Sequence, residues 1–84
     1  MNNKVLVSLI VPSIEERYNV FIPINKKTIE IIFLLNKAIN DMTNGSFPLN
    51  NNLSLINAET GVIYDVDSTF IENNILNDTK LILI

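Results

Sequence analysis

Two pairs of acidic side chains are the groups in this chain whose type and spacing could do chemistry. Glu15 and Glu16 are adjacent, and Asp65 and Asp67 are separated by one residue. Paired carboxylates can hold a hard cation such as Ca²⁺, but this ion takes six to eight oxygens from a defined loop. The segment that follows Asp65 lacks the glycine and the distal glutamate of an EF-hand loop. We interpret both pairs as solvated turn residues and expect no metal site.

The side chains most often used for nucleophilic and acid–base catalysis are missing. The 84 residues contain no cysteine and no histidine, which excludes thiolate nucleophiles, thiolate metal sites and imidazole bases. A pair of glycosidase-type acids would need a cleft between them. A domain of this size with one helix can barely supply such a cleft. We expect no enzymatic activity and no cofactor.

The charge balance argues against a nucleic-acid partner. Six basic and nine acidic residues give a formal net charge of −3, whereas binding to phosphate backbones depends on excess positive charge. Lys26 and Lys27, together with Lys4, could form a basic spot that binds a phosphate at a helix N-terminus. The alternative that we favour is that these lysines serve solubility.

Composition predicts a single globular domain over residues 1–84. Apolar residues make up 48% of the chain and charged residues 18%, which is typical of a folded protein. The apolar runs 5–11, 29–35 and 81–84 are each too short for a signal peptide or a membrane span. We therefore expect a soluble, cytoplasmic protein that does not insert into a membrane.

Periodicity predicts a hairpin followed by a helix. Strands are expected at about 4–11 and 18–24, and Pro23 indicates that the second of them lies at a sheet edge or has a bulge near its end. Apolar residues then recur at helical spacing, which predicts a helix over about 28–42 with Thr28 as its N-cap. Gly45 suits the left-handed residue after that helix.

The second half of the chain predicts short strands separated by turns. These strands are expected at about 53–57, 62–64 and 79–84, with a single helical turn capped by Ser68 before the last one. A helix on one face of a sheet buries the apolar surfaces of both. The predicted fold class is α+β: a β-grasp, in which a mixed four- to five-stranded sheet packs on one helix.

This element order resembles ubiquitin over essentially the whole chain. The helix entry Thr28-Ile29-Glu30 and the segment 53–57, at the place of ubiquitin's third strand, are similar to that protein. The ending 68–84 also looks like the family's ending, which is a short helical turn, a polar turn and a strand. These features are markers of the fold and not catalytic motifs.

Within the ubiquitin-like group the chain is most similar to the bacterial YukD/EsaB family, in its length, its element order and the pattern of 75–84. That resemblance implies a cytosolic accessory or regulatory component of a type VII secretion system. It also implies a protein partner, such as the cytoplasmic part of a membrane-anchored secretion component. Which partner this is, and whether the chain activates or restrains secretion, are not determined by the sequence.

Conjugated ubiquitins carry a C-terminal Gly-Gly tail, and this sequence has no such pair of glycines. The chain has only Gly45 and Gly61, and it ends at Leu83-Ile84. Conjugation is therefore not expected. The alternatives are a ubiquitin-like modifier or sulfur-carrier relative, and a homo-oligomeric structural domain.

Surplus apolar residues give a hypothesis for the contact surface. Strand alternation directs Leu6, Ile10, Phe21 and Ile82 away from the helix, toward the opposite face of the sheet. Adjacent exposed apolar residues can form a docking face for a partner or for a homodimer. In the alternative, loop 43–52 folds over the sheet and covers these side chains. The sequence leaves both interpretations open.

Overall fold

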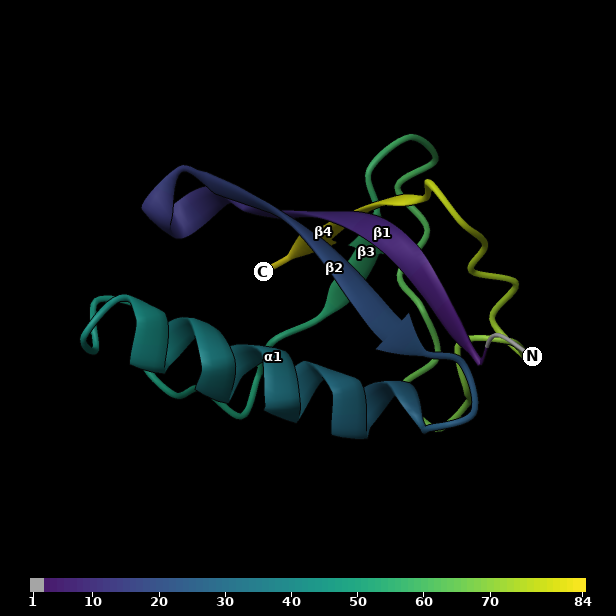
Figure 1. Ribbon diagram of the computed structural model, residues 1–84, viewed down its shortest axis with the longest axis horizontal. Coiled ribbons are helices and arrows are strands. Elements are labelled where there is room, and N and C mark those ends of the chain that lie inside the picture. The colour runs from purple at the N-terminus through teal and green to yellow at the C-terminus, as the bar shows by residue number, and fades with distance from the viewer. Residues whose placement is uncertain (1–2) are drawn as a thin grey trace.

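The computed structural model describes residues 3–84, so Met1 and Asn2 of the predicted domain lie outside the described residues. A curved sheet lies over one side of a single helix (Figure 1). The elements, in chain order, are β1 (Lys4–Val11), a 3-10 turn η1 (Pro12–Ile14), β2 (Glu16–Pro23), α1 (Thr28–Met42), β3 (Leu55–Asn57) and β4 (Lys80–Leu83).

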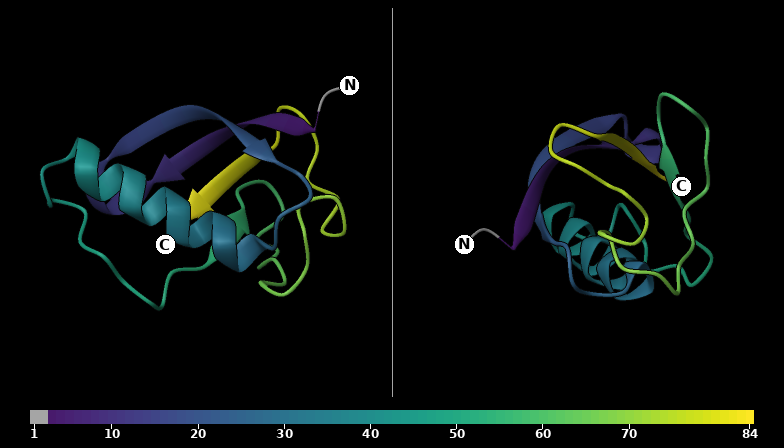
Figure 2. Two further views of the ribbon diagram at one scale, coloured as in Figure 1. Left: turned by 60° about the horizontal axis from the view of Figure 1, so that its bottom comes forward. Right: turned by 90° about the vertical axis from the view of Figure 1, so that its right-hand side faces the viewer.

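The sheet is mixed and four-stranded, as the sequence predicts. Its strand order is β2-β1-β4-β3, with β1 parallel to β4 and both outer pairs antiparallel. The two most apolar strands therefore lie in the middle, and β2 occupies an edge. Figure 2 shows the sheet curving around the helix from two further directions. Pro23 ends the edge strand, where a missing backbone N–H costs no ladder hydrogen bond.

Some predicted strand limits are wrong. The segment 62–64 forms no strand, because Ile63 makes only an isolated bridge to Ile56. The chain turns tightly at Gly61, whose φ of 76° lies in the left-handed region, and the pairing does not extend beyond this bridge. The other strands span Glu16–Pro23, Leu55–Asn57 and Lys80–Leu83 rather than 18–24, 53–57 and 79–84.

The helix spans the predicted residues, but its predicted cap is wrong. Lys27 occupies the N-cap position without a side-chain hydrogen bond, and Thr28 is the first helical residue. The buried Thr28 hydroxyl donates to the Ser68 carbonyl at 2.7 Å and accepts from Asn73 Nδ2 at 3.0 Å. Thr28 therefore joins the helix to the distant 65–73 segment instead of capping its own turn.

The predicted Ser68 cap is also wrong. Thr69 and Glu72 exchange hydrogen bonds: the Thr69 N–H donates to Glu72 Oε1 at 2.8 Å, and the Glu72 N–H donates to Thr69 Oγ1 at 3.1 Å. This reciprocal pair is the arrangement of a capping box. The Ser68 hydroxyl instead donates to Asp65 Oδ2 at 3.0 Å.

The core lies between the inner face of the sheet and α1. Alternate residues of β1 point inward onto the buried stripe of the helix, as strand and helix periodicity require. Segments without regular structure complete the core, since Phe47, Phe70 and Ile75 are all buried. Within residues 3–84 no helix is long and apolar enough to cross a membrane.

Loop 43–52 packs against the helix and not over the opposite face of the sheet. Asn36 Nδ2 donates to the Pro48 carbonyl at 3.1 Å, and the Asn50 N–H donates to Asn36 Oδ1 at 2.8 Å. Asn40 Nδ2 donates to the Phe47 carbonyl at 2.9 Å. Figure 2 shows this loop running alongside α1. The interpretation in which the loop covers the sheet is therefore wrong.

Candidate protein-interaction surface

The four residues predicted for the contact surface lie on the face of the sheet that points away from α1, which we call the outer sheet face. The strand register pairs Leu6 with Phe21 across β1 and β2, and Ile10 with Ile82 across β1 and β4. Directly paired side chains on one face lie about 4.5–5.5 Å apart at Cβ. The structure therefore brings the predicted residues together as two apolar pairs.

A polar row separates these two pairs. Ser8 lies between Leu6 and Ile10 on β1, and its register partners are Asn19 on β2 and Lys80 on β4. The sequence hypothesis treated the four residues as one group. The register shows two apolar areas with a polar strip between them.

One of the apolar areas extends further than the sequence predicted. Ile82 pairs with Ile56 on β3, and Ile56 bridges to Ile63. Ile10, Ile82, Ile56 and Ile63 thus form a continuous line across the sheet, which we call the isoleucine row. Ile63 is 67% exposed at its end. Alternation along β3 places Ile56 outward, because its neighbour Leu55 is buried, whereas only the tertiary fold brings Ile63 alongside it.

The charged residues at the outward positions of the four strands have one sign. Lys4, Arg17 and Lys80 occupy outward strand positions, because they pair with or alternate with the residues above. Within the four strands no acidic residue takes an outward position. Three of the six basic residues of an acidic chain therefore gather on this face. Such an arrangement favours a partner with acidic groups around an apolar centre.

The acidic pairs behave as turn residues. Asp65 Oδ1 accepts from the Asp67 N–H at 3.0 Å, a local turn interaction that holds the backbone. Glu15 and Glu16 are exposed at the start of β2. Within residues 3–84, groups of three or more metal-ligating side chains are absent.

The helix N-terminus does not offer free donors to a phosphate. The Thr28 N–H donates to the Ser68 carbonyl and the Ile29 N–H to the Val66 carbonyl, both at 2.9 Å. The next two N–H groups donate to the Lys27 carbonyl. Anion binding at a helix end depends on unoccupied N–H groups. This geometry favours the solubility interpretation of Lys26 and Lys27.

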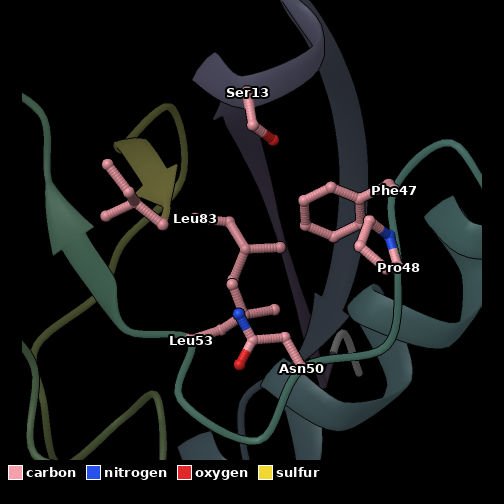
Figure 3. A pocket seen from close by; sticks show the side chains of 7 residues that line it. Ser13, Phe47, Pro48, Asn50, Leu53 and Leu83 are labelled. Atoms are coloured by element: carbon pink, nitrogen blue, oxygen red, sulfur yellow. The ribbon is translucent and has the colours of Figure 1, made fainter.

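A cavity of about 300 Å³ opens between the loop after α1 and the end of β4. Figure 3 shows Phe47, Pro48, Leu53 and Leu83 around it, with Ser13 and Asn50 as its polar side chains. None of the lining side chains titrates near neutral pH. The cavity has the character of an apolar cleft and lacks the acid–base groups of a catalytic site.

Comparison with known proteins gives no match to a family model and no match among curated proteins. Solved structures do match. The ubiquitin-like domain of EccD5 from Mycobacterium xenopi superimposes with a TM-score of 0.78 and 16% identity, covering 99% of this chain and 94% of that chain. The fold is ubiquitin-like.

Two further neighbours of this ubiquitin-like chain are a domain of a secretion protein and a chain of a membrane complex. The ubiquitin-like domain of the type VII secretion protein EccD1 from Mycobacterium tuberculosis has a TM-score of 0.75 and 9% identity, covering 100% of this chain and 99% of that chain. A chain of the ESX-5 inner membrane complex has a TM-score of 0.80 and 16% identity, and this chain spans 21% of its length. Identities this low show a shared fold, which many functions use.

Proposed function

We propose that this chain is a non-catalytic protein-interaction module of a bacterial type VII secretion system, and that it docks a partner on the outer sheet face. Its partner in this proposal is the cytoplasmic part of a membrane-anchored secretion component. The observation that carries the docking proposal is the isoleucine row flanked by basic side chains.

The energetics of this face support a binding role. Several aliphatic side chains lie side by side on a sheet surface that the loop after α1 leaves uncovered. Burial of apolar surface contributes about 25 cal/mol per Å² and drives most protein association. The basic rim formed by Arg17 and Lys80 would add orientation and faster association with an acidic partner.

The assignment to secretion rests on two kinds of likeness. The sequence resembles the YukD/EsaB family in its length and in the pattern of 75–84. The solved neighbours include the ubiquitin-like domains of the type VII secretion protein EccD1 and of EccD5. The absence of histidine and cysteine from the sequence supports a role without catalysis.

The proposal is tested by affinity capture from the detergent-solubilised lysate of the host, with bound proteins identified by mass spectrometry. We expect the wild type to retain a component encoded with the secretion system. Phe21→Glu and Ile63→Glu should each abolish this binding, because they bring an acid onto the outer sheet face at exposed positions. Both variants should remain folded by circular dichroism, since Phe21 is 65% and Ile63 67% exposed.

Leu49→Glu is the matched control. Leu49 is 63% exposed but lies in the loop that packs on the helix, away from the outer sheet face. This variant should bind as the wild type does. Retention of the partner by both sheet variants, or equal loss with Leu49→Glu, would contradict docking on the outer sheet face. Absence of any secretion component from the wild-type sample would contradict the secretion role itself.

A further inference from the structure

The solvent-facing side of α1 is unusually apolar for an exposed helix surface. Four apolar side chains on it are exposed, and Phe33 is 63% accessible. A helix that is apolar on both sides is normally buried on both sides. We call this surface the helix face, and its apolar members are Ile29, Phe33, Leu34 and Ala38.

Four exposed charges run along the middle of the helix face. In chain order they are Lys26, Glu30, Lys37 and Asp41, so their signs alternate. A helix advances 100° per residue, which aligns Glu30, Lys37 and Asp41 along one line between two apolar flanks. Lys26 precedes the helix but borders the same shallow groove of about 550 Å³ as Glu30, Phe33 and Leu34.

The order of these four charges lets two antiparallel copies of the helix pair each charge with an opposite one. The midpoint between Phe33 and Leu34 is equally far along the chain from Glu30 and Lys37, and equally far from Lys26 and Asp41. When two copies of the helix pack antiparallel about that midpoint, each acid lies opposite a base of the other copy. A parallel arrangement would instead bring like charges together.

We propose that the helix face is the interface of a homodimer in which the α1 helices of two copies pack antiparallel about a two-fold axis near Phe33 and Leu34. A two-fold axis makes the same patch serve on both copies. At the axis the aromatic ring of Phe33 meets its own symmetry mate, and Leu34 does the same on the other flank. Glu30 then pairs with Lys37, and Lys26 with Asp41, twice each.

The area of the helix face suits such a dimer. The exposed parts of its four apolar side chains amount to roughly 350 Å², within the range of functional surface patches. The four charged side chains between the apolar flanks add roughly as much again. A standard interface buries about 800 Å² per partner, so one helix face supplies about one side of such an interface.

The first test uses sedimentation velocity over about 5–500 µM protein, a range that covers dissociation constants typical of moderate interfaces. We expect a concentration-dependent monomer–dimer equilibrium. Glu30→Lys alone and Lys37→Glu alone should each weaken dimerisation about tenfold, because each change creates two like-charge contacts. The double variant Glu30→Lys/Lys37→Glu should recover dimerisation, since the exchanged charges are again opposite.

Two controls separate loss of this dimer from unfolding of the variants and from dimerisation through the outer sheet face. Circular dichroism confirms that each variant is folded, and the recovery by the double variant cannot arise from unfolding. A wild type that stays monomeric throughout the series overturns the proposal. A dimer that the charge variants do not affect, but that Ile63→Glu abolishes, also overturns it, because that dimer would use the outer sheet face.

A second test exploits the absence of cysteine from the chain. Leu34→Cys brings one thiol next to the proposed axis, so mild oxidation should link two copies. Met42→Cys is the matched control, being exposed on the same helix. Because a helix rises 1.5 Å per residue, the two control thiols would lie roughly 25 Å apart, which is too far for a disulfide. Equal cross-linking of the two variants would contradict the antiparallel arrangement.

Discussion

Single polar side chains join the segment 65–73, which has no regular structure, to the start of α1. The Thr28 hydroxyl, fully buried at the start of α1, contacts Ser68 and Asn73, which are 40 and 45 residues away in the sequence. Asn73 Nδ2 also donates to the Asp65 carbonyl at 2.9 Å. Buried polar groups stabilise a fold only when they are paired, and these are. The segment 65–73 is thereby fixed across the end of the helix.

Glu72 gives the fold a dependence on pH. The hydrogen bonds from Thr69, first through its backbone and then through its side chain, lower the pKa of Glu72 below its ordinary value of 4.5. A carboxylate with a lowered pKa in the folded chain stabilises the fold above its unfolded pKa. That contribution is lost as pH falls through the folded pKa.

We therefore predict that Glu72→Gln lowers the urea midpoint at pH 7, and that its difference from the wild type shrinks as pH falls below 4.5. Urea unfolding between pH 7 and pH 3 measures this. Glu59→Gln, at an exposed turn, is the control for the loss of one negative charge. A difference between Glu72→Gln and the wild type that stays constant over this range would contradict the assigned role.

Among the elements, α1 and the loop that follows it act as one unit. Asn36 is a buried polar residue on the helix, and both its amide oxygen and its amide nitrogen bond the backbone of that loop. Phe47 inserts from the loop into the core. The loop is consequently drawn against the helix, which leaves the outer sheet face open.

Asn36→Ala should destabilise the chain by about 1–3 kcal/mol, because the Pro48 carbonyl and the Asn50 N–H lose their partner. We expect amide hydrogen exchange at Asn50 to accelerate more than global unfolding accounts for. Asn51→Ala, at an exposed neighbouring position, should change stability by less than about 0.5 kcal/mol. Equal effects of the two substitutions would show that the Asn36 contacts do not hold the loop.

The whole molecule depends on side chains from segments without regular structure. Phe70 is fully buried although it belongs to no helix or strand. An 84-residue domain has a stability of about 4–13 kcal/mol, at about 0.05–0.15 kcal/mol per residue. Loss of one large core side chain is therefore a substantial part of the total.

Phe70→Ala should destabilise the protein by about 3–5 kcal/mol. In a domain of this size, that lowers the melting temperature by at least about 12 °C, as measured by thermal circular dichroism. Ile71→Ala, next in the chain but 59% exposed, should change the melting temperature only slightly. A small shift in the melting temperature with Phe70→Ala would mean that the core does not depend on the Phe70 ring.

The outer sheet face and the helix face belong to different layers of this molecule (Figure 1). They meet at the β2 edge, where Phe21 lines one pocket with Leu34 and Ala38. A homodimer through α1 would leave the isoleucine row of both copies available, because that row runs from β1 through β4 and β3 to Ile63, away from the β2 edge. Such a dimer would present two docking surfaces, and linked binding sites raise the apparent affinity for a partner that is itself repeated or clustered.

The local pattern of the sequence determined the helix and the central strands. Helical periodicity over 28–42 and the β-branched run of β1 predict these elements within a residue or two, because both signals come from neighbours along the chain. The same alternation directed Leu6, Ile10, Phe21 and Ile82 to one face. The element order predicted that the helix covers one face of the sheet, so these four residues were expected on the other face.

Only the tertiary structure decided what surrounds those residues. The strip of Ser8, Asn19 and Lys80 between the two apolar pairs, and the addition of Ile63 to the isoleucine row, depend on strand register. The hydrogen bonds from Asn36 to the backbone of Pro48 and Asn50 likewise join residues that no local sequence pattern relates. Register and side-chain pairing are set by contacts between residues far apart in the chain, and a periodicity carries no information about such contacts.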